Sequence, residues 1–105
     1  RAEARRAKYE REAIGRRVTR RLATASRAVA PAHAGSAAAE AEVAAQARAT
    51  EGVRRENELG TRSQLEVLNA EQEFAASRTR LAAARRNMVV ATFNLWAAEG
   101  RLAAE

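Results

Sequence analysis

The sequence predicts an all-α fold, a long antiparallel helical hairpin of the coiled-coil type, and three observations point to it. Of the 105 residues, 29 are alanine and only 20 are larger apolar residues, so little apolar surface is available for a thick core. Alanine, arginine, glutamate and leucine all favour helix, and no stretch alternates apolar and polar residues with the period of a strand. Apolar residues instead recur every seven positions, as they do in coiled coils.

The first helix is predicted over about residues 1–58, and Pro31 is its one irregular position. Two heptad columns pass Pro31 without a change of phase: Leu22, Val29, Ser36, Val43 and Thr50, and Val18, Ala25, Ala32, Ala39, Gln46 and Val53. A loop would usually reset the phase, so we favour one long helix with a kink near Pro31. A break at Ala30 to Gly35 would instead give three helices and a compact bundle.

The connection is predicted at residues 59–62. Gly60 suits the left-handed position just past the end of a helix. Ser63 with Glu66 and Thr61 with Gln64 are two overlapping capping signals for a following helix. So short a connection forces the two helices to be antiparallel neighbours.

Arg62 lies at the apex of this turn and has two interpretations. Its role is structural, as a solvated tip residue or through a bond back to the last carbonyls of the first helix, or it makes a bidentate contact with a carboxylate or the backbone of another chain. The sequence alone does not choose between them.

The second helix is predicted over about residues 63–103 and shows the clearest pattern. Large apolar residues occupy every seventh position, and small residues follow three positions later. The large residues are Val67, Phe74, Leu81, Met88, Leu95 and Leu102, and the small ones are Ala70, Ser77, Ala84, Ala91 and Ala98. Large residues against small ones let two helices approach closely, so we interpret these columns as the hairpin seam. Val90, Phe93 and Trp96 lie off the seam, which favours further helical neighbours on other sides.

Positive charge is concentrated at the start of the chain. The net charge is +6, and residues 1–21 hold nine Lys or Arg and three Glu, so the remaining residues are neutral overall. This distribution is typical of a solvated helical face, or of a generic helical binding module that uses its first 21 residues on nucleic acid or anionic lipid. No stacking aromatic residues or recognised motif accompany the charge, so we expect no nucleic-acid partner.

Several classes of function are excluded by residue types. The chain has no cysteine and no aspartate, and His33 is its one histidine, so we expect no catalytic, cofactor-binding or metal site and no enzyme activity. No run of 18 apolar residues could cross a membrane. The opening segment RAEARRAKYERE lacks the apolar core of a signal peptide, so we expect any export signal of the parent protein to lie outside this chain.

The second half of the chain resembles the last periplasmic hairpin of the TolC-like outer membrane factors. Their tip pattern, VGTRT followed by L-D-V-L-N-A, matches Leu59 to Ser63 and then Leu65, Val67, Leu68, Asn69 and Ala70. The following helix shares Leu81, Ala84, Arg85, Leu95, Gly100 and Leu102 with that family. About 45 residues match, and the preceding 58 residues match mainly in length and helical character. Where the family's tip often carries an aromatic residue five positions before the arginine, this chain has Asn57.

The resemblance implies a fold, a location and a set of partners. It implies that residues 1–105 are one hairpin from the periplasmic portion of a Gram-negative outer membrane protein. It also implies a homotrimer whose β-barrel, the only membrane contact, lies outside this chain together with a first, related hairpin. Such trimers form export ducts for type I secretion or multidrug efflux, and the wording of the tip favours type I secretion. The residues Leu59, Gly60, Thr61, Arg62 and Ser63 would dock a periplasmic adaptor (membrane fusion protein) and gate the entrance.

Overall fold

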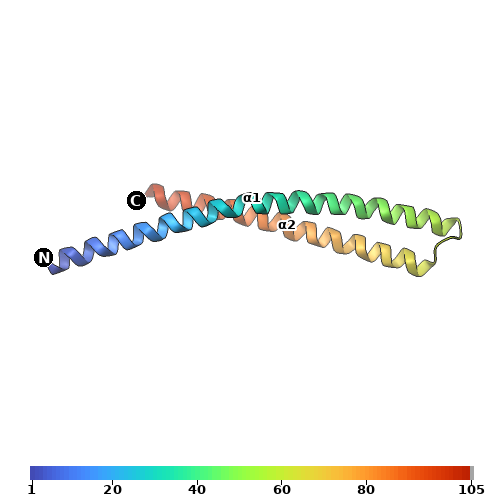
Figure 1. Cartoon of the computed structure of the whole chain (residues 1–105), viewed down its shortest axis with the longest axis horizontal. Helices are drawn as coiled ribbons and strands as arrows, with labels where there is room; N and C mark the ends of the chain where they lie inside the picture. The colour runs from blue at the N-terminus through green and yellow to red at the C-terminus, as the bar shows by residue number, and fades with distance from the viewer. Residues whose placement is uncertain (105) are drawn as a thin grey trace. The chain divides into compact units, whose positions relative to one another are not determined.

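The computed structural model describes residues 1–104 and contains two helices over that range. Helix α1 spans Ala2–Glu58 and helix α2 spans Gln64–Ala104, and no strand occurs among the described residues. A short turn joins the two helices, at the green-to-yellow transition in Figure 1. The predicted all-α hairpin of two long helices is therefore confirmed.

Helix α1 continues through Pro31, so the three-helix alternative with a break at Ala30 to Gly35 is wrong. Pro31 is exposed, and strong helix formers flank it on both sides, so the helix continues past the one hydrogen bond that proline cannot donate. The chain divides into two compact units. One unit contains residues 32–88, and the other contains residues 1–31 together with the segment that begins at Val89.

In the unit of residues 32–88, small and hydroxyl-bearing side chains form the buried contact between the helices. Ser36, Ala39 and Thr50 of α1 and Ser77 and Leu81 of α2 are buried. The Thr50 hydroxyl lies 2.8 Å from the carbonyl oxygen of Gln46 in its own helix and 3.2 Å from that of Ala70 in α2. The Ser77 hydroxyl donates to the carbonyl of Phe74 at 2.6 Å. The hydroxyls of Thr50 and Ser77, the two most deeply buried, are therefore hydrogen-bonded, which offsets the cost of burying them.

Three ion pairs cross between the helices of this unit. Arg54 pairs with Glu71 at 3.1 Å, the Arg80 Nε lies 3.1 Å from Glu42, and Arg85 pairs with Glu40 at 3.4 Å. Hydrogen bonding to Glu42 raises the pKa of Arg80. Exposed ion pairs of this kind each contribute little stability. They nevertheless favour this alignment of the two helices, because a shifted alignment would separate the paired side chains. Partners earlier in α1 meet partners later in α2, as an antiparallel hairpin requires.

The predicted seam of α2 faces α1 in both units, to different depths. In residues 32–88, Leu81 is buried and Val67, Phe74 and Met88 are half-buried. The guanidinium of Arg78 covers the ring of Phe74 at 4.9 Å. In the other unit Leu95 is half-buried, but Leu102 remains 44% exposed.

The unit that contains the two ends of the chain is packed mainly by alanine. Val18 of α1 and Ala91 and Ala98 of α2 are its buried apolar residues. Large apolar side chains of α2 remain exposed there, with Phe93 at 65% and Trp96 at 66%, and Val89 and Val90 beside them. Neither helix, over the residues that the structure describes, is long and apolar enough to span a membrane.

Candidate functional site

The turn between the helices begins with a Schellman motif at the end of α1. The amide of Gly60 donates to the carbonyl of Asn57 at 3.0 Å, and the amide of Thr61 donates to the carbonyl of Glu56 at 2.8 Å. This pattern requires a left-handed residue at Gly60, whose φ is 82°. Thr61 adds a second bond to the same carbonyl, because its hydroxyl donates to Glu56 at 2.9 Å. The carbonyls of Arg55, Glu56 and Asn57 thus accept hydrogen bonds from the chain itself.

Ser63 is the residue that caps α2. Its hydroxyl oxygen accepts a hydrogen bond from the amide of Glu66 at 3.2 Å, and its carbonyl accepts one from Val67 at 3.2 Å. Of the two overlapping capping signals, the one at Ser63 is therefore used as predicted. The one at Thr61 is not used to cap α2, because its hydroxyl closes the end of α1 instead.

Arg62 joins the two helices across the turn. Its Nε donates to Glu56 near the end of α1, and its Nη1 donates to Glu66 in the first turn of α2 at 2.8 Å. These bonds, that to Glu66 first, raise the pKa of Arg62, and the same contact lowers the pKa of Glu66. The guanidinium therefore binds carboxylates of its own chain. It does not bond to the last carbonyls of α1, which is one of the possibilities that the sequence leaves open.

Asn57 adds a second link across the same turn. Its side-chain amide donates to the carbonyl of Arg62 at 2.8 Å, and its oxygen lies 3.5 Å from the Gln64 side-chain nitrogen. The residue thus fixes the backbone at the apex from the α1 side. It stands at the position where the resembled family often carries an aromatic residue.

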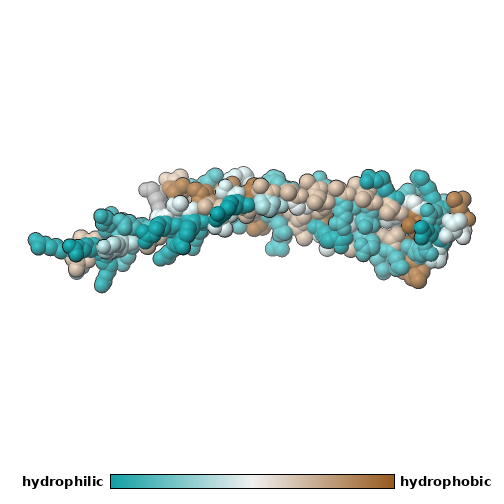
Figure 2. Space-filling view, viewed as in Figure 1, coloured by the Kyte–Doolittle hydropathy of each residue, from teal (hydrophilic) through white to brown (hydrophobic). Residues whose placement is uncertain are grey.

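The polar network fixes a tip that presents apolar side chains outward. Leu59 is 78% exposed and Leu65 is 65% exposed, and Leu68 is half exposed one turn further along α2. Figure 2 shows brown, apolar atoms at the end of the molecule where the turn lies. A rigid turn that exposes leucines is suited to bind an apolar surface of another protein.

Sequence reasoning placed Leu59, Gly60, Thr61, Arg62 and Ser63 at one turn, and the structure brings these five residues together there. The pairing of Arg62 with Glu56 and Glu66 was not predicted, nor was the link that Asn57 makes across the turn. A signal was present in the spacing, because an arginine with a glutamate six residues before it and another four residues after it can pair with both across a turn. The exposure of Leu65 was not predicted either, because this leucine lies only two residues before Val67, the first residue of the predicted seam.

No candidate metal site occurs at this turn among the described residues. Within residues 1–104, no group of three or more His, Cys, Asp or Glu side chains could hold a metal ion.

Comparison with known proteins finds a relative that covers nearly the whole chain. The chain is 32% identical over 99 residues to the outer membrane efflux protein BepC of Brucella suis biovar 1 (strain 1330). The match takes in 94% of this chain, which spans about a fifth, 22%, of the relative's length. No protein-family model matches the chain, and no solved structure matches it significantly. The chain is therefore similar, along almost its entire length, to one segment of an outer membrane efflux protein.

Proposed function

We propose that this chain is a periplasmic helical hairpin of a trimeric, TolC-like outer membrane export duct, and that its tip docks a periplasmic adaptor and gates the entrance. The observation that carries the proposal is the match of 94% of the chain to an outer membrane efflux protein. The tip residues Leu59 to Ser63 also resemble the same class of protein. Because the relative is described as an efflux protein, we favour efflux over type I secretion as the transport process of the duct.

The geometry of the tip supports adaptor docking. A docking surface needs a fixed backbone and accessible apolar side chains, because binding then orders few new residues. The Schellman motif and the Arg62 ion pairs provide the fixed backbone. Leu59 and Leu65 provide the apolar contacts. In this proposal Arg62 holds the tip in its docking shape, and release of its ion pairs accompanies opening.

The exposed apolar residues of α2 support assembly with further helices. Val89, Val90, Phe93 and Trp96 cover one stretch of α2 that α1 leaves open. In a trimeric duct, neighbouring hairpins would cover such a stretch, which accounts for large apolar residues outside the seam.

A segment exchange in the relative tests the proposal. The segment of BepC that aligns with this chain is replaced by this chain, in a Brucella strain that lacks its own BepC. We expect the hybrid to restore growth at drug concentrations that inhibit the deletion strain. A hybrid that reaches the outer membrane as a trimer and restores no resistance would contradict the proposal.

Tip variants of the hybrid test docking separately. The double substitution Leu59→Ser/Leu65→Ser should abolish resistance while trimer levels stay unchanged, because it removes the exposed apolar contacts. Ile14→Ser, which changes a half-exposed apolar residue far along α1, is the matched control and should retain resistance.

Cysteine cross-linking tests the same surface. The chain itself contains no cysteine, so an introduced cysteine is its one reactive thiol. Leu59→Cys should cross-link to the adaptor, and Ile14→Cys should not. Equal cross-linking at both positions would mean that the tip is not the docking surface.

A further inference from the structure

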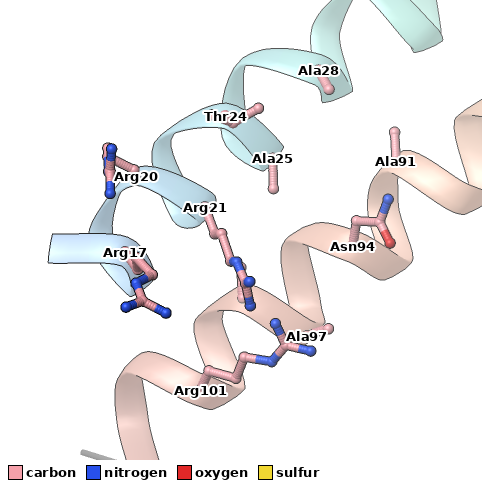
Figure 3. A pocket seen from close by; sticks show the side chains of 11 residues that line it. Arg17, Arg20, Arg21, Thr24, Ala25, Ala28, Ala91, Asn94, Ala97 and Arg101 are labelled. Atoms are coloured by element: carbon pink, nitrogen blue, oxygen red, sulfur yellow. The ribbon is translucent and has the colours of Figure 1, made fainter. Parts of the chain in front are cut away.

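A groove between α1 and α2 in the unit of the chain ends gathers four arginines. Arg17, Arg20 and Arg21 reach it from α1 and Arg101 reaches it from α2, around a cavity of about 630 Å³. Figure 3 shows Arg21 extending from α1 toward α2, where the guanidinium of Arg101 lies. Two cations from opposite helices thus lie on the same groove, although like charges repel at short range.

No carboxylate within the described residues 1–104 forms an ion pair with these four arginines. For the three arginines of α1, the sequence explains why. Residues 13–39 of α1 and residues 74–98 of α2 contain no acidic residue at all. The unit of residues 32–88 behaves differently, because its arginines Arg54, Arg80 and Arg85 each pair with a glutamate of the facing helix. The four groove arginines are therefore a cluster without a paired carboxylate, whereas Arg54, Arg80 and Arg85 each have one on the facing helix.

The rest of the groove lining defines what could compensate the charge. Its floor is made of small side chains, Ala25, Ala28, Ala91, Ala97 and Ala98, and its neutral polar groups are Thr24 and Asn94. No aromatic residue lines it, so bases of a nucleic acid would find nothing to stack on. Guanidinium groups bind phosphate oxygens in a bidentate manner, and a compact group of high charge suits several guanidiniums that share one cavity.

We propose that this groove binds a compact ligand that carries more than one phosphate group, held between Arg21 of α1 and Arg101 of α2. Arg17 and Arg20 supply further positive charge at its edge, and Thr24 and Asn94 supply hydrogen-bonding groups. The alanine floor gives the ligand close access to both helices. The site is independent of the hairpin tip, and neither its presence nor its absence bears on the proposed export function.

The test uses inorganic pyrophosphate as the probe, titrated into the chain by calorimetry at low ionic strength. We expect saturable binding of one pyrophosphate per chain. In Arg21→Gln/Arg101→Gln the affinity for pyrophosphate should fall about tenfold or more, because both guanidinium groups that bind its phosphates are lost. The matched control is Arg11→Gln/Arg27→Gln, which removes the same charge from α1 without touching the groove lining. The affinity of this control variant for pyrophosphate should change less than about twofold, because the two lost charges act on the groove only weakly and from a distance.

Unfolding of the variant is distinguished by its melting temperature without ligand. Removing two like charges that share a groove should not lower that temperature, whereas the stabilisation by pyrophosphate should disappear. An absence of binding to the unaltered chain would overturn the proposal. An equal loss in the groove and control variants would also overturn it, since it would show diffuse attraction to the basic segment.

Three further probes identify the chemistry and the source of the ligand. Vesicles that contain cardiolipin, whose headgroup carries two phosphates, and compete with pyrophosphate would support a lipid headgroup as the source, and failure to compete would support a soluble phosphate. A glutamate-rich peptide that binds more tightly than pyrophosphate would overturn the phosphate assignment in favour of carboxylates. A single-stranded oligonucleotide that binds equally to the groove and control variants, and displaces pyrophosphate from both, would overturn the groove as the site.

Discussion

Arg62 connects the last turn of α1 to the first turn of α2 through two carboxylates, Glu56 and Glu66. The contact lowers the pKa of Glu66 below its ordinary value of 4.5. A carboxylate with a lower pKa in the folded state binds its proton more weakly there than in the unfolded chain. It therefore stabilises the hairpin above the unfolded pKa, and this contribution is lost as the pH falls through the folded pKa.

The first prediction follows from this linkage. Arg62→Gln should lower the melting temperature at pH 7, and the difference from the unaltered chain should shrink as the pH is lowered from about 5 to below the folded pKa of Glu66. Arg48→Gln is the control, because Arg48 lies on α1 with no carboxylate partner among the described residues. Thermal melts at several pH values measure the effect. A difference that persists unchanged at low pH would show that Arg62 acts through packing and not through charge.

Two glycines give a second prediction with opposite signs. Neither Gly60 nor Gly52 has an atom within 4 Å of the position that a β-carbon would take. Gly60 has a φ of 82°, so Gly60→Ala should destabilise the hairpin by roughly 1–2 kcal/mol through backbone strain alone. Gly52 lies inside α1, so Gly52→Ala should stabilise it by roughly 0.5–1 kcal/mol. Urea unfolding of both variants measures the signs, and the same sign for both would contradict the Schellman geometry.

The contact between the two helices follows the seven-residue pattern along both of them. Of the two columns predicted for α1, Val18, Ser36, Ala39 and Thr50 are buried and every other member is half-buried. The sequence could predict this register because a heptad repeat places its members on one face whatever the neighbouring helix is. It also favoured continuity through Pro31, since the phase did not change there.

The tip could be predicted only in part. Gly60 and Ser63 were identifiable because each has a conformation or a cap position that few residues can fill. The network of Glu56, Asn57, Arg62 and Glu66 could not be predicted in the same way. Its bonds cross from one helix to the other, so they depend on which of two capping signals starts α2, and both signals were present in the sequence.

A third prediction tests the seam itself. Leu81 is buried between the helices, so Leu81→Ala should destabilise the hairpin by about 2–5 kcal/mol through lost contacts and a cavity. Leu68→Ala removes the same atoms from a half-exposed position of the same helix and should cost roughly 0.5 kcal/mol or less. Chemical denaturation of the two variants measures the difference. Similar losses in both would mean that the register of α2 is wrong.

Across the whole molecule, charge is divided unevenly between the two compact units. Residues 32–88 contain eight Lys or Arg and eight Glu, whereas residues 1–31 and 89–105 contain eleven and five. The entire net charge of +6 therefore belongs to the unit of the chain ends. Self-repulsion should weaken that unit at low ionic strength, while the neutral unit gains from its ion pairs.

The fourth prediction is an opposite response of the two units to salt. Raising the salt concentration from about 0.02 to about 0.5 M should slow amide hydrogen exchange in residues 13–28, because it screens the repulsion between arginines. Exchange in residues 40–55 should stay the same or become slightly faster, because the ion pairs of Glu40, Glu42 and Arg54 are screened as well. Mass spectrometry of peptides from one sample reports both regions. A uniform response along α1 would contradict the division of charge.

The alanine, serine and threonine side chains buried between the helices also determine how the chain responds to temperature. Unfolding exposes methyl and hydroxyl groups there, with few large apolar surfaces to be hydrated. The heat capacity change per residue should therefore lie below the roughly 12–15 cal/mol/K of ordinary globular domains. A small heat capacity change flattens the curve of stability against temperature, so the hairpin loses little stability on cooling and keeps a nearly constant helix contact across a wide range of growth temperatures.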